Sequence, residues 1–350
     1  MNPARPRLTV ALTGLNAVDS PGPGVAVARA LRESPAYDVR LIGLSYEALE
    51  PGIYLPDLFA RSYQLPYPSA GTAALRTRLL EIHEREQLDV IIPNFDAELY
   101  NFGRLAPELA AHGIHTFLPT AAQLEMRDKL NLAAFGAEHG LQVPADMRLF
   151  GVADIPKAAA QLGWPLVLKG RYYDATVCHT PAQAEQAFWQ LQARWGAPVL
   201  AQQFVAGQEI NVAGLADGRG GLLSAVPMRK LFITDKGKAW AGITIADDAL
   251  PALARRFAAA TRWRGGFELE LMRTAAGELF IMEINPRFPA WIYLAVGAGH
   301  NQPAALLQLA RGEAVSDFNE YAVGKMFVRY AWDLVVDNAD FQQMASVGEL

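Results

Sequence analysis

Two acidic residues and an amide in the last third of the chain have the types and spacing of a magnesium site. Glu270 lies in the apolar run 267–271, and Glu283 and Asn285 follow beyond a Thr-Ala-Ala-Gly loop. The loop predicts a β-hairpin, and alternation along a strand places Glu283 and Asn285 on one face. If Glu270 pairs with Glu283, directly or diagonally, all three side chains share that face. Carboxylate and amide oxygens are hard ligands that suit Mg²⁺.

The Glu-Ile-Asn-Pro-Arg run that begins at Glu283 ends in a fixed positive charge. The planar guanidinium of Arg287 suits a phosphate or a carboxylate. A solvated strand face is the alternative interpretation, and it explains the isolated Glu268 well. It explains the run itself poorly, because Asn and Pro disfavour the interior of a strand. We therefore expect Glu268 in solvent and an ion-binding site at 283–287.

Two lysines and a glycine turn are weaker candidates. Lys129 opens a predicted helix, and Lys169 ends a strand of Leu and Val. Alone, Lys169 is better interpreted as an edge residue that keeps its ammonium in water than as a charge held for an anion. A second strand ends at Gln202, turns at Gly207 and continues with Glu209. In isolation an ordinary turn is the better interpretation, although such a hinge can offer backbone groups to a base and a carboxylate to a ribose.

Together, Lys129, Lys169, the hinge to Glu209, Glu270 and the run 283–287 resemble the ATP-grasp superfamily. The branch most similar to this pattern is that of biotin carboxylase and the carbamoyl-phosphate synthase large subunit, and the resemblance covers nearly the whole chain. It implies a combined α/β and α+β fold, in which a doubly wound parallel sheet precedes an ATP-grasp fold with a small lid. The implied domains are a pre-ATP-grasp domain at 1–120, a linker helix and lid at 121–205, and a C-terminal ATP-grasp subdomain with the metal site at 206–350.

The resemblance also implies ATP and Mg²⁺, with Mn²⁺ as a substitute, and a role for each matching residue. The nucleotide would be bound by Lys129 and Lys169 at the phosphates, Gln202 and the backbone of Gln203 and Val205 at the adenine, and Glu209 at the ribose. The metal would be bound by Glu270, Glu283 and Asn285. The charges that stabilise the transferred phosphate would be Arg287 and, by a looser match, Arg229 and Lys230.

The activity implied is that of a ligase that activates a small-molecule carboxylate as an acyl-phosphate, releases ADP and joins the acyl group to an amine. Two alternatives remain open: phosphorylation of bicarbonate or carbamate, and a nucleotide sensor without turnover. The sensor is motivated by the loop 170–176, which has one glycine where the family commonly has a Gly- and Ser-rich loop. Closure over the phosphates would then use Arg171 or the tyrosines Tyr172 and Tyr173.

Composition narrows the class of protein. The 350 residues are 51% hydrophobic and carry 31 basic and 36 acidic side chains, so the net charge is −5. A mildly acidic chain is a poor candidate for broad nucleic-acid binding. The single cysteine, Cys178, excludes an internal disulfide and a Cys-based zinc cluster. The absence of a long apolar stretch argues against a membrane partner. We expect a cytoplasmic enzyme, and the assembly state stays open, a homodimer included.

The elements that must position these residues follow from the apolar pattern. Strands at 8–12, 39–43, 89–93 and 115–118 alternate with helices at 25–31 and 75–86, which predicts a parallel sheet. Next come a helix at 129–139 and a unit of two strands around a helix at 145–205. The C-terminal part is expected to hold strands at 209–215, 221–228, 266–273 and 278–285, and a helix at 250–261.

Two further groups of residues lie near the expected site. Asp96 and Glu98 follow the third strand, and either could hold a substrate amino group, with equal weight given to N-capping by Asp96. Trp291 and Tyr293 follow Arg287 and could line an acceptor pocket. Core packing is the favoured interpretation for both aromatic residues.

Overall fold

The computed structural model describes residues 5–171 and 174–350, and the chain folds into two compact units. Unit 1 comprises Met1–Gln123, Asn211–Glu268 and Asn285–Leu350. Unit 2 comprises Leu124–Ile210 and Leu269–Ile284. Of the predicted metal ligands, the two glutamates therefore belong to unit 2 and the asparagine belongs to unit 1.

Unit 1 contains a parallel four-stranded sheet in the order β3-β2-β1-β4. β1 (Arg7–Leu12) lies between β2 (Asp38–Ser45) and β4 (Val90–Ile92), and β3 (Arg61–Gln64) forms the edge beside β2. The inner strands carry short apolar runs, Val-Ala-Leu in β1 and Leu-Ile-Gly-Leu in β2, as parallel strands with two covered faces require. The predicted parallel sheet is confirmed. β3 was missed because its four residues, Arg-Ser-Tyr-Gln, have no apolar pattern.

The fourth strand expected in this sheet is reduced to a single bridge between His115 and Val90. Beyond that bridge, the guanidinium of Arg264 donates to the carbonyl groups of Thr116 and Leu118, at 3.3 and 2.8 Å. The strand prediction is wrong beyond His115, because a side chain takes the carbonyl groups that a neighbouring strand would use.

A six-stranded sheet has the order β13-β12-β9-β10-β11-β14. Its strands are β9 (Gln208–Asp217), β10 (Leu222–Ile233), β11 (Ala239–Thr244), β12 (Arg264–Arg273), β13 (Leu279–Asn285) and β14 (Met326–Val328). The four predicted C-terminal strands are all present. β11 and β14 were not predicted, because one is a short run interrupted by Gly242 and the other has only three residues.

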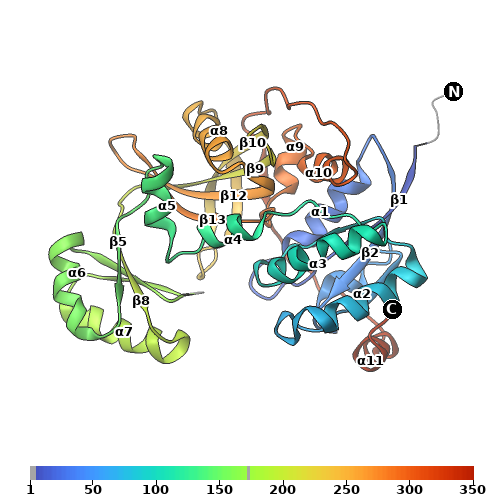
Figure 1. Cartoon of the computed structure of the whole chain (residues 1–350), viewed down its shortest axis with the longest axis horizontal. Helices are drawn as coiled ribbons and strands as arrows, with labels where there is room; N and C mark the ends of the chain where they lie inside the picture. Colours follow the sequence, from blue (N-terminus) through green and yellow to red (C-terminus); the bar gives the residue numbers. More distant parts are fainter. Residues whose placement is uncertain (1–4, 172–173) are drawn as a thin grey trace. The chain divides into compact units, whose positions relative to one another are not determined.

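Unit 2 contains a second four-stranded sheet, with antiparallel neighbours in the order β5-β8-β6-β7. Figure 1 shows helices α6 and α7 beside this sheet. Buried Leu, Val, Ala and Cys side chains pack against buried residues of both helices, Phe188 among them. Two strands were expected here and four are found. The elements are β5 (Asp146–Leu149), α6 (Ile155–Leu162), β6 (Leu166–Lys169), β7 (Ala175–Cys178), α7 (Pro181–Trp195) and β8 (Val199–Gln203).

The helix expected at 129–139 begins later than predicted, as α5 (Leu132–His139). The carboxylate of Asp128 accepts from the backbone N–H of Leu130 at 2.9 Å, and the Asp128 carbonyl accepts from Asn131 at 2.8 Å. These bonds close a turn, because a short acidic side chain competes for backbone donors. Lys129 therefore lies in a turn before the helix.

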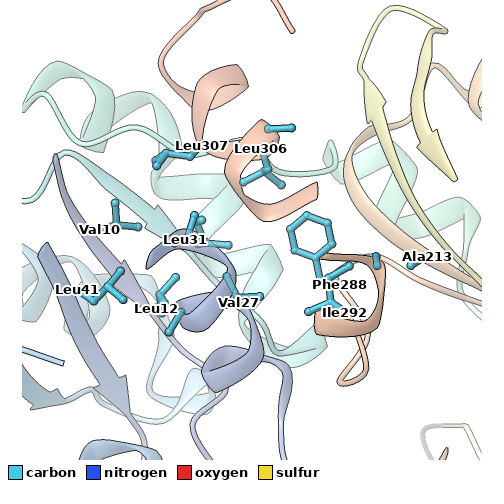
Figure 2. Packing of buried hydrophobic residues seen from close by; sticks show 14 of the residues in the cluster. Val10, Leu12, Val27, Leu31, Leu41, Ala213, Phe288, Ile292, Leu306 and Leu307 are labelled. Carbon is cyan, nitrogen blue, oxygen red and sulfur yellow. The ribbon is translucent and has the colours of Figure 1, made fainter. Parts of the chain in front are cut away.

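One buried apolar cluster joins the parallel sheet of unit 1 to segments near the end of the chain. Figure 2 shows Leu12 of β1, Val27 of helix α1 (Pro23–Arg32), Phe288, Ile292 and Leu306 in this cluster. Each of these side chains is at most 5% exposed. Burial of this kind fixes the backbone on either side, so Phe288 anchors the residue before it.

The remaining helices connect these layers. They are the 3₁₀ turns η1 (Pro51–Tyr54), η2 (Pro68–Ala70), η3 (Asp96–Glu98) and η4 (Val152–Asp154), and the helices α2 (Gly71–Glu86), α3 (Leu99–Ala111), α4 (Ala121–Met126), α8 (Ala249–Thr261), α9 (Tyr293–Gly297), α10 (Gln302–Ala310) and α11 (Asn338–Val347). Among residues 5–171 and 174–350, none of the helices has the length and apolar character to cross a bilayer.

Candidate functional site

Unit 2 brings together both predicted phosphate lysines and both predicted metal carboxylates. Nζ of Lys129 lies 3.6 Å from Oε2 of Glu283, and the two side chains are 23% and 32% exposed. Lys169 interacts electrostatically with Glu283, Lys129 and Glu270. Residues separated by more than 150 positions in the sequence thus form one charged cluster with two cations and two carboxylates.

Lys169 is a partly desolvated member of this cluster. Burial lowers the pKa of its ammonium, while the nearby carboxylates of Glu283 and Glu270 raise that pKa and the Lys129 ammonium lowers it. A buried cation is costly unless an opposite charge compensates it. Lys169 is therefore not the snorkelling edge residue that its sequence context favours when it is considered alone.

The sheet face around Lys169 carries two acceptors without donors. In antiparallel register Lys169 faces Leu200 on β8, and Asp146 of β5 faces Gln202, two residues along β8 on the same side. Within the described residues, Oε1 of Gln202 and Oδ2 of Asp146 are buried and have no hydrogen-bond partner. Burial raises the pKa of Asp146, while the positive charges of Arg148 and Lys169 lower it. Unpaired buried acceptors of this kind favour a ligand that supplies N–H or O–H groups.

The hinge after β8 is held tightly against β12. A Cβ atom on Gly207 would lie 2.1 Å from the carbonyl oxygen of Arg273, so only glycine permits this approach. The N–H of Gln203 donates to the carbonyl of Ala145 at 2.8 Å, so this donor is used by the protein itself. Val205 is buried and Glu209 is exposed.

Glu268 forms the buried polar centre of unit 1. Its Oε1 accepts from Asn211 Nδ2 at 2.8 Å and from Trp291 Nε1 at 2.7 Å, and its Oε2 accepts from Asn285 Nδ2 at 3.1 Å. The residue is only 6% exposed. The expectation of a solvated Glu268 is therefore wrong, because three donors from other elements replace water around the carboxylate.

This network orients the predicted metal ligand Asn285. Because Nδ2 of Asn285 donates to Glu268, the amide oxygen of Asn285 points away from Glu268. A side-chain oxygen presented in this way is a suitable ligand for a hard cation. Glu268 is thus a positioning residue that sequence reasoning missed.

Arg287 is held by an acidic partner in unit 1. Its Nε lies 2.9 Å from Oδ1 of Asp96, and its Nη1 donates to the carbonyl of Phe288 at 3.2 Å. Arg287 and Asn94 also line a small pocket at the carboxyl end of β4. Asp96 follows β4, so the ends of β4 and β13 meet at this ion pair.

Glu98 lies in the core and does not face a ligand. The side chain is fully buried, and Oε1 accepts from Thr13 Oγ1 at 2.5 Å and from the backbone N–H of Asn94 and Phe95. The hydroxyl of Tyr46 donates to Oε2. Burial raises the pKa of Glu98 to about 7, although these hydrogen bonds lower it. The suggestion that Glu98 binds a substrate amine is wrong, and Glu98 takes the capping role that was considered for Asp96.

Arg229 and Lys230 lie next to each other on β10, so their side chains point to opposite faces of the sheet. Nζ of Lys230 donates to the carbonyl of Gly237 at 3.3 Å, in the turn that follows the strand. Arg229 faces Ile243 of β11 across the sheet. Both residues belong to unit 1, as Asn285 does.

The aromatic residues and the cysteine have structural roles. Trp291 is buried against Glu268, and the hydroxyl of Tyr293 donates to Glu33. Cys178 is buried in the core of unit 2. Tyr172 and Tyr173, which were expected to help closure over phosphates, lie outside the described residues. Within the described part of the chain, no three His, Cys, Asp or Glu side chains gather as a metal cluster.

Comparison with known proteins gives consistent matches. Residues 196–331 match the family described as ATP-grasp in the biosynthetic pathway with Ter operon. D-alanine–D-alanine ligase of Bordetella pertussis is 36% identical over 113 residues, 31% of this chain and 35% of that enzyme.

Two solved structures extend the likeness over most of the chain. The biotin carboxylase domain dimer of Hydrogenobacter thermophilus 2-oxoglutarate carboxylase, in complex with MgADP, ADP and bicarbonate, has a TM-score of 0.69 at 15% identity and covers 88% of this chain and 70% of that one. The L-amino acid ligase from Bacillus licheniformis has a TM-score of 0.65 at 18% identity, with 88% and 75% covered.

The two structural matches each cover 88% of this chain, whereas the match to the curated relative is partial. The chain spans about a third of the length of the curated relative described above, 35% of it. At identities below a fifth, the structural likeness establishes the fold and leaves the chemistry to be argued from the site. The expected fold class, a parallel α/β sheet combined with α+β parts, is confirmed.

Proposed function

We propose, from the premise that this chain belongs to the ATP-grasp superfamily, that it is an ADP-forming carboxylate–amine ligase. The observation that carries the proposal is the charged cluster of unit 2, in which Lys129 and Lys169 meet Glu270 and Glu283. Cations for phosphates and carboxylates for a divalent metal are the two parts that phosphoryl transfer from ATP requires.

The nucleotide would lie against the face of the small sheet that carries Lys169. Lys129 and Lys169 would bind phosphate oxygens. The unpaired acceptor of Gln202 suits an exocyclic amino group such as that of adenine. The N–H of Gln203 is already used within the protein, so we assign base contacts to its carbonyl and to the backbone of Val205. The exposed carboxylate of Glu209 would accept from the ribose hydroxyls.

A divalent metal fits the remaining donors. Glu270, Glu283 and the Asn285 amide supply hard oxygens, and Glu268 holds the amide oxygen toward the ligand side. Mg²⁺, or Mn²⁺ in its place, would neutralise phosphate charge when bound. The Lys129–Glu283 ion pair would then exchange its partners, with the lysine turning to phosphate and the glutamate to the metal.

The reacting carboxylate would attack the terminal phosphorus of ATP, forming an acyl-phosphate and ADP, and an amine would then displace phosphate. Arg287, whose Nε is fixed by Asp96, would direct its positive charge to the charge that develops on the transferred group. Because Arg229 and Lys230 point to opposite faces of β10, only one of the two is assigned a secondary role on that phosphate. Both reaction steps need water excluded from the site.

Amino acids are the substrate class that we propose to test first. The relative from Bordetella pertussis is a D-alanine–D-alanine ligase, and the structural neighbour from Bacillus licheniformis is an L-amino acid ligase. Phosphorylation of bicarbonate is the second candidate, because the Hydrogenobacter neighbour binds bicarbonate with MgADP on the same fold.

The test is ADP release from the purified protein with panels of amino acids, dicarboxylates and bicarbonate, followed by mass analysis of products. Glu283→Gln should abolish release, whereas Glu278→Gln, in the exposed turn of the same hairpin, should not. A condensed product with ADP supports the ligase. ADP release with bicarbonate alone supports the second candidate. No stimulated release across all panels contradicts both and favours a sensor.

A further inference from the structure

The segment from Lys325 to Asp337 presents a row of large apolar side chains to solvent. Val328, Tyr330 and Trp332 are 67%, 71% and 68% exposed. Every second residue from 326 to 336 belongs to this row, and all are more than a third exposed: Met326, Val328, Tyr330, Trp332, Leu334 and Val336. The even positions are thus apolar throughout, whereas the odd positions hold four charged residues together with Phe327, Ala331 and Val335, the last of them 92% exposed.

The segment also begins at an open sheet edge. β14 is the last strand of the six-stranded sheet and pairs with β11 on one side. The N–H of Arg329 donates to the carbonyl of Trp240 at 2.9 Å, so the odd-numbered residues bond toward β11. By alternation, the backbone groups of Val328 and Tyr330 point away from the sheet. Monomeric proteins often block such an edge with Pro or with charged side chains; residues 325–337 contain no Pro but do carry four charges.

The charges of the segment are complementary to those of a second copy. Lys325, Arg329, Asp333 and Asp337 recur every four residues, with both positive charges first. In an antiparallel pair whose two-fold axis passes through Ala331, Lys325 faces Asp337 of the partner subunit and Arg329 faces Asp333 of the partner subunit. Arg329 is held in place by the carbonyl groups at 239 and 290, which use two of its five N–H groups.

The same register pairs the apolar row with itself. Tyr330 faces Trp332 of the partner subunit, and Val328 faces Leu334 of the partner subunit. Aromatic and aliphatic cross-strand pairs stabilise antiparallel strands, and like charges that face each other destabilise them.

Other registers lose these pairs. An axis through Tyr330 sets Arg329 against Ala331 of the partner subunit and Lys325 against Val335 of the partner subunit. An axis through Asp333 sets two aspartates against each other. The charge pattern therefore selects the axis through Ala331.

We propose that two copies of this chain associate by antiparallel pairing of residues 325–337 about a two-fold axis through Ala331. The pairing extends the six-stranded sheet of one copy into that of the other and satisfies the open backbone groups of β14. Ala331 faces Ala331 of the partner subunit across the axis. The two residues form a non-hydrogen-bonded pair, in which the Cα atoms lie about 4.5 Å apart.

Disulfide trapping tests the axis directly. A cysteine at the axis has the Cα separation that a disulfide accepts, about 4.4 to 6.8 Å, and the native Cys178 is buried. Under mild oxidation Ala331→Cys should form a covalent dimer on non-reducing gels. Val335→Cys is the matched control, because it would face Phe327 of the partner subunit and should stay monomeric. Equal trapping of both variants, or of neither, would overturn the register.

Light scattering on the full chain tests the charge pairs. The unmodified protein should have twice the 38.1 kDa of one chain. Asp337→Lys should shift it toward monomer, and Lys325→Asp combined with Asp337→Lys should restore the dimer. Both variants carry the Asp337→Lys change at the start of α11. If the double variant restores the dimer, the single variant lost the charge pair and not the stability of that helix. Tyr330→Pro should give a monomer with unchanged circular dichroism. A monomer at all concentrations, or a dimer insensitive to every variant, would overturn the proposal.

Discussion

The amide nitrogen of Asn285 lies 3.1 Å from Oε2 of Glu268, and this bond decides which end of the Asn285 side chain faces a ligand. Oε1 of the same carboxylate already accepts from two donors, Asn211 and Trp291. All three contacts are buried, so none is replaced by water at low cost. Glu268 therefore fixes the orientation of Asn285, the proposed metal ligand of unit 1.

Glu268→Gln should raise the Mg²⁺ concentration needed for turnover. The new amide keeps its oxygen toward Asn211 and Trp291, so its NH₂ faces Nδ2 of Asn285 and forces that amide to turn. Loss of such a supporting contact typically costs about 10- to 100-fold in metal affinity. The measurement is ADP formation as a function of Mg²⁺ and Mn²⁺. Trp291→Phe is the control, since it removes a donor but leaves the bond to Asn285. An equal shift in both variants would point to general loss of packing.

Lys169→Ala should weaken ATP more than adenosine. Its buried ammonium is placed to meet phosphate, and a hydrogen bond to a charged group contributes about 1.5–3 kcal/mol, or roughly 10- to 150-fold in affinity. Calorimetric titration of the variant with ATP, ADP and adenosine measures the difference. Lys157→Ala, at an exposed position of α6, should change none of the three affinities. Equal weakening of ATP and adenosine would exclude a phosphate role for Lys169.

Glu98 should make the protein less stable as the pH rises from 4.5 toward 7. Its folded pKa of about 7 exceeds the ordinary value of 4.5, so the folded state holds a proton that the unfolded state releases. Stability from this group is full below pH 4.5 and is lost as the pH rises through 7, by an amount on the order of 3 kcal/mol. Urea unfolding at a series of pH values should show this slope. Glu98→Gln should flatten it, and exposed Glu138→Gln should leave it unchanged. A wild-type curve that rises over this range would contradict the assignment.

The sequence predicts those parts of the site whose chemistry and position arise from one element. Glu283 and Asn285 are two residues apart on β13, so strand alternation alone places them on one face. The parallel sheet followed from runs of apolar residues in the same way. Lys169 entered the predicted site only when the order of motifs along the whole chain was added to its local context.

What the sequence could not predict depends on contacts between distant segments. Glu268 has the same alternation as Glu270, yet Asn211 and Trp291 bury it from positions 57 and 23 residues away. Asp146 was missed because β5 is a four-residue strand of mixed character, and its place opposite Gln202 depends on register. Asp96 could not be matched to Arg287 because nothing local links the end of β4 to the end of β13.

The last prediction concerns Arg287, at which the ligase and the sensor hypotheses give different results. Its Nε is fixed by Asp96 at 2.9 Å and its Nη1 donates to the Phe288 carbonyl at 3.2 Å, so the planar guanidinium is held in one orientation, and this plane suits a phosphate or carboxylate. Lysine keeps the charge but cannot hold Asp96 and a second anion in this geometry. In a ligase the interaction acts mainly on charge that develops during phosphoryl transfer, and its loss costs on the order of 10²–10³ in rate.

Arg287→Lys should therefore bind ATP nearly normally and lose most of its carboxylate-dependent ADP formation, with kcat and kcat/KM falling together. Asp96→Asn should give a smaller loss in the same two constants, because the guanidinium keeps its charge but loses its fixed orientation. Arg104→Lys, on the exposed surface of α3, is the control for the exchange itself. The measurements are steady-state ADP release and equilibrium binding of a non-hydrolysable ATP analogue. If Arg287→Lys changes nucleotide affinity alone, and the unmodified protein shows no acid-stimulated ADP release, the sensor hypothesis replaces the ligase.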